Sequence, residues 1–365
     1  MGSDHDQGSE SLAAPSGRLA VGGASAAVDT LPVSEPMAPD PLADVLHSVK
    51  LTGALFFLID ATSPWCVEVP QAGAFAPVIL PRAQHIISYH VAVQGSGLAS
   101  VPGIDPVRFE QGDIIVFPHA DPYLMLSAPG VPPELNAEQT MQFFRDMAAG
   151  RLPFVIREGG GEDPPAKFIC GFLGCDARPF NPLLATLPRL MHVRCNGAKR
   201  DDLLDRLVEL TFAEAQVQRA GGESIRLRLS ELMFVEVIRR YLEGLPVEQT
   251  GWLAGLRDPA IGRALALLHE RPTEAWSLDQ LARDVGLSRS VLADRFAQLV
   301  GQPPMQYLTS WRMQLAARLL SDGTAKVAAI AQEVGYASEA AFSRAFKKIT
   351  GLSPALWRKR FGGSG

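Results

Sequence analysis

The pattern of apolar and polar positions along the 365-residue chain changes character twice. Residues 1–40 are rich in Gly, Ala, Ser and Pro without an apolar period. Such a segment cannot bury enough surface to offset its ordering entropy, which predicts a disordered tail. Over residues 41–199, short β-branched or aromatic runs alternate with Gly and Pro turns. This pattern is typical of a small antiparallel β-barrel or sandwich.

Apolar residues at helical spacing predict two amphipathic helices within residues 200–245, separated by a break at Gly221 and Gly222. The second helix is apolar over more than one face, through Leu232, Phe234, Val235, Ile238 and Tyr241. Packing in a core and contact with a second copy of the chain both explain such a helix, and we expect the pair to serve a homodimer. Residues 246–258 are expected to form a linker.

The last hundred residues contain an internal repeat. Residues 277–308 match residues 326–357 over their whole length at a spacing of 49 to 50 positions, with one inserted residue. Each copy predicts a short helix, a turn and a second helix, which is the helix-turn-helix arrangement. The side chains expected in the two small cores are Val285, Leu287, Leu292, Phe296 and Leu299, and then Val334, Tyr336, Phe342, Phe346 and Ile349.

The turn of each copy has its own chemistry. Gly286 and Gly335 supply a left-handed backbone where a side chain would cost energy. Ser288 and Ser338 can then accept hydrogen bonds from the free amides of the second helix, whose N-terminal end would face DNA. A helix over residues 303–323 would join the two units on one side of the protein. Their second helices could then enter successive major grooves, roughly 34 Å apart.

At these residues the sequence resembles the AraC/XylS family of bacterial transcription regulators. The resemblance covers residues 259–361 and is most specific at GYASEAAFSRAFKKITGLSPALWR. It implies an all-α domain that binds double-stranded DNA, with base-facing residues at Arg289, Ser290, Ala293, Asp294, Ser338, Glu339, Ala340 and Arg344. Asp294 stands where a basic or amide side chain is expected, so it would accept from cytosine or orient Arg295.

Charge is distributed unevenly. The whole chain carries −5, but the part from Arg257 onward carries +6 and the part before it −11, as expected when one module meets phosphates. The candidate phosphate partners are Arg312, Lys347, Lys348, Arg358 and Lys359, for which a solvated basic face is the alternative. Trp311 and Trp357 are expected in the core.

The resemblance extends to the N-terminal half, where residues 89–101 and 109–125 look like a cupin domain of the AraC sensor kind. Cupin enzymes hold a metal with several His and a Glu. Here only His90 and His119 are available, and Tyr123 stands where another His would be. Two nitrogen ligands make a poor site, so no metal and no other cofactor is expected. These three residues are expected to line an effector pocket or to be satisfied structurally.

Cys170 and Cys175 are five residues apart. A turn between them would bring the thiols together, whereas a strand would place them on opposite faces. Packing of small residues at a bend, a redox-sensing pair, and a zinc site completed by Cys195, His192 or Cys66 all remain open.

The sequence thus predicts an α+β protein of two domains: a cupin-like β-barrel with a helical dimerisation pair, and an all-α double helix-turn-helix domain. The predicted function is a sequence-specific transcription regulator that senses a small molecule or an oxidant and recruits or blocks RNA polymerase. The alternative from another class is a metal-dependent cupin enzyme fused to a DNA-binding module. Architectural DNA binding is disfavoured because a charge of +6 is small for affinity from phosphates alone.

The cellular location is predicted from what the sequence lacks. No apolar run approaches the roughly 20 residues that span a bilayer. The acidic first ten residues are unlike a secretory signal. Four scattered cysteines are too few for a disulfide framework. We therefore expect a cytoplasmic protein without a membrane partner.

Overall fold

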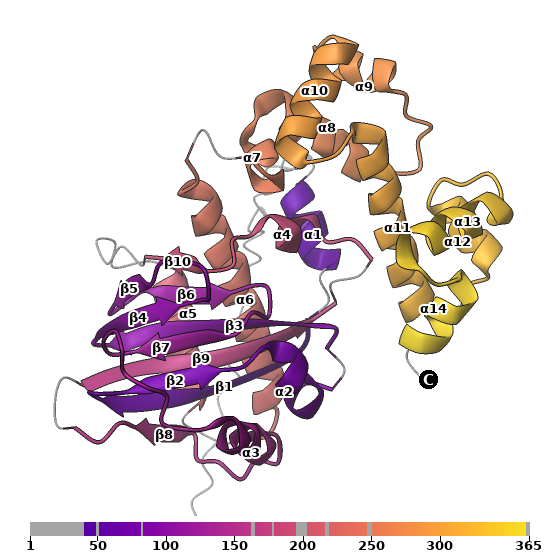
Figure 1. The fold of residues 1–365 in the computed structure, drawn as a ribbon. Helices are drawn as coiled ribbons and strands as arrows, with labels where there is room; N and C mark the ends of the chain where they lie inside the picture. The colour runs from indigo at the N-terminus through magenta and orange to yellow at the C-terminus, as the bar shows by residue number, and fades with distance from the viewer. Residues whose placement is uncertain are drawn as a thin grey trace, which may run out of the picture. The chain divides into compact units, whose positions relative to one another are not determined.

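The computed structural model describes residues 40–48, 51–81, 83–161, 165–176, 179–194, 203–215, 219–246 and 250–362. Apart from Asp40, the tail predicted over residues 1–40 lies outside this range, as does Cys195. The described part has a β-rich N-terminal region and an all-helical C-terminal region, as the sequence predicts (Figure 1).

Two sheets make up the N-terminal region (Figure 1). The larger has the strand order β10-β6-β3-β9-β1-β8 and the smaller the order β2-β7-β4-β5. The strands are β1 (Leu51–Thr62), β2 (Cys66–Val69), β3 (His85–Gln94), β4 (Ser96–Ser100), β5 (Val107–Glu110), β6 (Ile114–Phe117), β7 (Tyr123–Leu126), β8 (Val155–Glu158), β9 (Pro165–Cys175) and β10 (Met191–Val193). Strands β1 and β8 pair in parallel, and the other pairs are antiparallel.

Strand β9 shows how side-chain alternation builds the layers. Phe168, Cys170 and Phe172 belong to the core between the two sheets. Ile169 and Leu173 belong to the core on the opposite face of the larger sheet. Successive side chains of a strand point to opposite faces, so a strand buried on both sides is apolar almost throughout. The larger sheet therefore packs on the smaller sheet with one face and on helix α6 with the other.

The pairing of the described strands gives two facing sheets, which agrees with the sandwich alternative, while closure into a barrel stays a prediction. Strand length and turn chemistry can be recognised in a sequence. Closure depends on the tilt and stagger of strands far apart in it.

Six helices accompany the sheets in the described residues of this region: α1 (Pro41–Ser48), α2 (Ala72–Ile79), α3 (Ala137–Ala148), α4 (Pro182–Thr186), α5 (Leu203–Ala215) and α6 (Gly222–Glu243). The predicted pair of helices within 200–245 is confirmed as α5 and α6. Gly221 stands before α6 with a φ of 80°, a conformation that a side chain would disfavour. On α6, Phe234 and Ile238 are buried while Leu232 is exposed.

The C-terminal region is helical throughout its described residues. Its helices are α7 (Trp252–Arg257), α8 (Pro259–Glu270), α9 (Leu278–Asp284), α10 (Arg289–Val300), α11 (Pro304–Asp322), α12 (Val327–Glu333), α13 (Glu339–Thr350) and α14 (Pro354–Phe361). The long helix α11 runs between the group formed by α8, α9 and α10 and the group formed by α12, α13 and α14 (Figure 1). No described helix combines the length and the apolar character needed to cross a bilayer.

Helix α7 lies where the sequence predicted a linker over residues 246–258. Trp252 is fully buried, and its indole N–H donates to the hydroxyl of Tyr307 over 2.8 Å. The segment is short and begins after a glycine, so its pattern suggests a connection. The indole ring of Trp252 is nevertheless buried in the core of the helical region.

The two small helical cores agree with the predicted ones at most positions. Leu292 and Phe296 are fully buried in the first unit, and Phe342 and Phe346 in the second. Ile349 departs from the prediction with 37% of its surface exposed, because it lies one residue before the end of α13, where fewer neighbours cover it. The other predicted core residues are buried or partly buried, and Trp311 and Trp357 are buried as predicted.

Candidate DNA-binding surface and candidate effector cavities

The first helix-turn-helix unit consists of α9 and α10. Gly286 has a φ of 74° at the turn, as its place in the repeat predicts. The hydroxyl of Ser288 accepts a hydrogen bond from the amide of Val291 over 3.3 Å and caps α10. A capped N-terminus leaves the first turn of this helix ordered at the end that would approach DNA.

The second unit consists of α12 and α13 and repeats this geometry. Gly335 has a φ of 80°, and the hydroxyl of Ser338 accepts from the amide of Ala341 over 3.1 Å. Gly335 also faces a tight contact that Gly286 lacks. A Cβ atom at Gly335 would lie 2.9 Å from the backbone of Thr273, whereas one at Gly286 would meet nothing within 4 Å.

Most of the predicted base-facing residues are exposed. They lie on α10 and α13, the second helices of the two units, or at the N-terminal caps of these helices. The exposed ones are Arg289, Ser290, Asp294, Ser338, Glu339, Ala340 and Arg344. Ala293 is half-buried. Two-thirds of the Arg289 side chain (67%) is exposed, and its guanidinium lies 3.7 Å from Asp279. An exposed pair at this distance contributes little and leaves the guanidinium available to a ligand.

The cations of the two units differ in their partners. In the first unit Arg295 donates to the carboxylate of Asp258, the residue that caps α8, so this charge is already paired within the protein. Asp294 therefore does not serve to hold Arg295. In the second unit Arg344, Lys347 and Lys348 are exposed, and no residue in the described ranges forms an ion pair with them.

Arg312, which was predicted to contact phosphate, forms hydrogen bonds within the protein instead. The residue is half-buried on α11, and its guanidinium donates to the backbone carbonyls of Pro272 and Glu274. Burial lowers the pKa of this guanidinium. A Cβ atom added to Gly335 would lie 3.1 Å from the Cζ atom of Arg312. Arg312 therefore fastens the loop that precedes α9 against the turn of the second unit.

Arg358 and Lys359 are the remaining candidate phosphate partners, on α14. The guanidinium of Arg358 donates to the carbonyl of Ala325, so part of its hydrogen-bonding capacity is used within the protein. Lys359 is exposed.

In the N-terminal region the structure brings three of the five predicted effector residues together. His90 lies with its Nδ1 2.9 Å from the sulfur of Cys170 and its Nε2 2.9 Å from the hydroxyl of Tyr123. All three side chains are buried in the core between the sheets. Burial lowers the pKa of His90 to about 3, so the ring is neutral and one of its nitrogens donates while the other accepts.

His119 and Cys175 lie apart from this trio. His119 hydrogen-bonds to the carbonyl of Leu187 through its Nε2 over 2.7 Å. Cys175 belongs to the core on the far face of the larger sheet, whereas Cys170 belongs to the core between the sheets. Five residues of strand separate the two cysteines by roughly 16 Å, which no disulfide spans. The strand alternative from the sequence therefore applies, and the two thiols cannot pair directly in this fold.

The thiols are also poorly suited to oxidation. Burial raises the pKa of Cys66 to about 11 and of Cys175 to about 12, and carries that of Cys170 well above its usual value. Carboxylates near Cys66 and Cys170 raise these pKa values further. Oxidants react with the thiolate form of cysteine, and nearby positive charge favours that form. Burial and nearby carboxylates keep these cysteines in the thiol form instead.

A small cavity lies between the sheets beside His90 and Cys170. Four phenylalanines line it, namely Phe57, Phe143, Phe144 and Phe172. Its polar lining includes Cys66, Thr140 and two carboxylic acids, Glu68 and Glu158. No motif in the sequence marks these acids or aromatic rings. Their positions are scattered over β1, β2, α3, β8 and β9, and only the packing of the two sheets with α3 brings them together.

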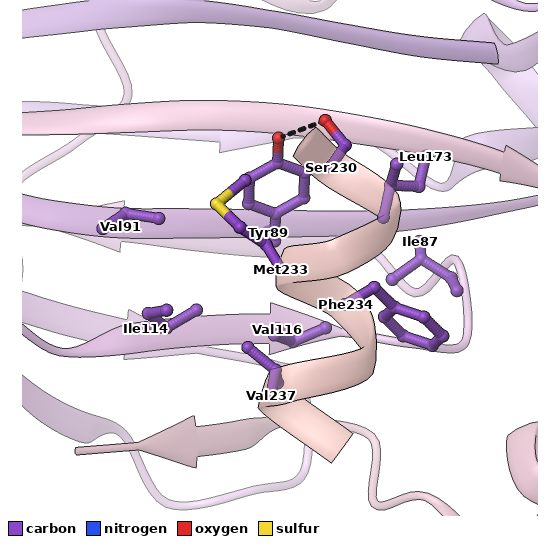
Figure 2. A pocket seen from close by; sticks show the side chains of 10 residues that line it. All are labelled: Ile87, Tyr89, Val91, Ile114, Val116, Leu173, Ser230, Met233, Phe234 and Val237. Carbon is purple, nitrogen blue, oxygen red and sulfur yellow. Dashed lines mark hydrogen bonds between the residues drawn. The ribbon is translucent and has the colours of Figure 1, made fainter. Parts of the chain in front are cut away.

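A second small cavity lies on the other face of the larger sheet, under α6 (Figure 2). Its lining is apolar apart from two hydroxyls, those of Tyr89 and Ser230, which lie 3.3 Å apart and form a hydrogen bond. Figure 2 shows Met233, Phe234 and Val237 of α6 above the strand residues Ile87, Val91, Ile114 and Val116. A ligand in this cavity would press directly on α6.

Within the described ranges, no group of three or more His, Cys, Asp and Glu residues is arranged to hold a metal ion. His192, which the sequence offered as a zinc ligand, bonds instead through its Nε2 to the carboxylate of Asp113 over 2.8 Å.

Two helix-turn-helix units beside a two-sheet region define the class of the protein as a transcription regulator with a helical DNA-binding domain. The chain matches two protein families, one described as Cupin over residues 40–243 and one described as Helix-turn-helix domain over residues 281–360. By this match, and by the relatives below, the chain belongs to the AraC family of transcription regulators and carries a cupin N-terminal domain.

Two relatives match nearly from end to end. A putative AraC-like transcription regulator from Streptomyces lividans is 33% identical over 321 residues, which cover 88% of this chain and 98% of the relative. The HTH-type transcriptional regulator AlkR from Acinetobacter baylyi is 34% identical over 323 residues, which cover 88% of this chain and 99% of the relative. Among solved structures, the DNA-binding domain of AdpA in complex with a target DNA is 31% identical over 28% of this chain and 93% of that chain, with a TM-score of 0.28.

Proposed function

We propose that this regulator recognises a specific DNA sequence by placing α10 and α13 in successive major grooves of double-stranded DNA. The single observation that carries the proposal is the repeated geometry. Both helices begin at a serine cap and present exposed polar residues in their first two turns. Base edges in the major groove are recognised by such side chains, and nearby cations supply affinity through phosphates.

The experiment is a selection of bound sequences from a random DNA pool with the full chain. We expect a two-part consensus whose parts are about one helical turn apart. Arg344→Ala should relax the preference at one position and lower affinity by roughly 10- to 100-fold, which corresponds to about 1–3 kcal/mol. Arg108→Ala, an exposed change in the N-terminal region, is the matched control. A folded protein that enriches no consensus would overturn this function.

We further propose that α5 and α6 mediate a homodimer. Four large apolar side chains are exposed on these helices: Leu203 (50%), Leu210 (56%), Ile225 (47%) and Leu232 (53%). Each helix carries its two at a spacing of seven residues, which places them on one face. The hydroxyl of Thr211 lies 3.6 Å from the sulfur of Met233, so Leu210 and Leu232 stand at the same level of the helix pair. Exposed apolar groups in such an arrangement are typical of association surfaces.

Sedimentation equilibrium checks the dimer. Replacing both Leu210 and Leu232 with Glu should shift the full chain to monomers, because two charges per subunit would be buried at the contact. Leu356→Glu, at a comparably exposed leucine (48%) on α14, should leave the association constant unchanged. Equal association of both variants would contradict the assignment of this surface.

The sensor region is proposed to respond to a small molecule rather than to an oxidant, since its described thiols are buried and protonated. Helix α6 lies over the apolar cavity with one face and carries Ile225 and Leu232 on another. A ligand that moves α6 would therefore change the dimer and the spacing of its DNA-binding domains. Coupling of about 1–3 kcal/mol is enough for a switch that recruits or blocks RNA polymerase.

A further inference from the structure

The cavity between the two sheets combines an aromatic lining with acids. The rings of Phe57 and Phe143 meet edge to face with centroids 5.8 Å apart, as do those of Phe144 and Phe172. Around this aromatic wall stand His90 and Cys170, both buried, and the carboxyl groups of Glu68 and Glu158. Glu68 is exposed whereas Glu158 is half-buried, so the charge of Glu158 is the one that is costly beside the apolar surface.

The charged groups that act on this lining are all acids. The pKa of Glu158 is raised to about 7 by burial and by its carboxyl neighbour Glu134, which also hydrogen-bonds to it. Three acids also act on the neighbouring thiols. Glu68 and Glu134 raise the pKa of Cys66, and Glu158 raises that of Cys170. The lining of the cavity therefore combines acids with aromatic rings and includes no Lys or Arg.

The cations of the neighbouring strands lie on the other side of the sheet. Glu158 is in register with Ala61 on β1, and Ala61 with Ala166 on β9. Asp60, Arg157 and Lys167 occupy the adjacent register position, so their side chains point to the opposite face. Lys167 is paired there with Asp60 over 3.7 Å. The titratable groups that share the cavity lining with Glu158 are Glu68, Cys66, the neutral His90 and Cys170, and Glu134 is its hydrogen-bonded neighbour.

We propose that this cavity is a second ligand site of the sensor region, separate from the cavity under α6, and that its ligand is a small organic cation with apolar substituents, such as a quaternary ammonium that carries an aromatic ring. A cation of this kind gains from aromatic faces and would pair with Glu158, which no cation neutralises within the described residues. Its apolar part would fill the space among the phenylalanines. The inference deepens the proposed sensor role and rests on it.

Binding is measured directly on the full chain by isothermal titration calorimetry with two compounds of the same shape. Benzyltrimethylammonium carries the positive charge, and neopentylbenzene replaces its nitrogen with carbon. We expect the cation to bind at least tenfold more tightly than the neutral compound. Equal or weaker binding of the cation would overturn the proposal, because the cavity would then be recognising shape alone.

Variants locate the site. Glu158→Gln keeps the shape of the side chain and removes its charge, so it should abolish most of the preference for the cation and leave neopentylbenzene unaffected. Phe143→Leu should weaken both compounds. Glu110→Gln, at an acid on β5 with 70% of its side chain exposed, is the control and should change neither affinity. A preference that persists in Glu158→Gln, with the thermal transition of the variant unchanged, would place the cation elsewhere and refute the assignment.

The pH dependence provides a second readout. Because the pKa of Glu158 is raised to about 7, its charged form grows as pH rises from 6 to 8. The affinity for benzyltrimethylammonium should rise severalfold over that range in the natural chain and stay flat in Glu158→Gln. A flat profile in the natural chain would contradict the role of Glu158. DNA binding is measured separately and without ligand, so failure of the cation site leaves the DNA-binding function standing, and failure of DNA binding is seen independently.

Discussion

The two helix-turn-helix units have the same cap and turn but different surroundings. In the first, Gly286 is open to space and Arg295 is paired with Asp258. In the second, the turn is pressed against the loop that precedes α9, and the cations of α13 are unpaired within the described residues. The two copies of the repeat therefore differ in the packing of their turns and in the pairing of their cations. The second unit carries three exposed cations without an ion pair in the described residues, and its turn also contacts the loop that precedes α9.

The two turn glycines test this difference most strongly. Gly335→Ala should lower the free energy of unfolding by about 2–4 kcal/mol, because it adds a close contact with the Thr273 backbone to the cost of a left-handed residue. Gly286→Ala should cost only the conformational part, about 1–2 kcal/mol. Urea unfolding of both variants measures the difference. Equal losses would mean that the tight contact at Gly335 relaxes freely and that the turns are equivalent.

Loss of the hydrogen bonds made by Arg312 should have the next largest effect on the free energy of unfolding. Arg312→Ala leaves the carbonyls of Pro272 and Glu274 without their donor, which should cost about 1–3 kcal/mol. If these hydrogen bonds also fix the orientation of the two units, the variant should lose more affinity for a two-part site than for either half alone. Arg318→Ala, an exposed change on the same helix, serves as the control. A uniform loss on all three DNA molecules would indicate a phosphate contact, as the sequence first suggested.

The smallest expected effects concern single cations. Lys347→Ala should weaken all DNA sequences alike and reduce the slope of log affinity against log salt by about 1. Arg295→Ala should leave that slope unchanged, because its charge is already balanced by Asp258, and should cost roughly 0–1 kcal/mol of stability. Titrations at several salt concentrations distinguish the two. If Arg295→Ala changed the slope more than Lys347→Ala, then Arg295 rather than Lys347 would be the cation that contacts phosphate.

Local patterns predicted the helical part well because its chemistry is local. The spacing of apolar residues, the glycine of each turn and the serine after it act within four or five positions of the chain. Leu292, Phe296, Phe342 and Phe346 could therefore be assigned to cores from their period alone, and they are buried. Helix α7 escaped prediction because Trp252 gains its burial from residues some fifty positions away.

The proposed ligand site between the sheets could be predicted only in part from the sequence. His90, Tyr123 and Cys170 were recognised by residue type and by resemblance, and they meet in the structure. Cys175 was grouped with Cys170 by spacing and lies in a different core, because a strand turns neighbouring positions to opposite faces. No pattern along the chain marked Glu158 or the four phenylalanines around it.

By itself the sequence determined the class of each region, the repeat, the turns and caps of the helix-turn-helix units, and the residues that they expose. Those features follow from backbone conformation and from periodicity, which neighbouring residues specify. Tertiary structure alone decided the two-sheet arrangement, the division of the thiols between two cores, the tie formed by Arg312 and the acidic aromatic cavity. Each of these joins side chains from distant segments, and their distances and charges exist only once the sheets and helices have packed.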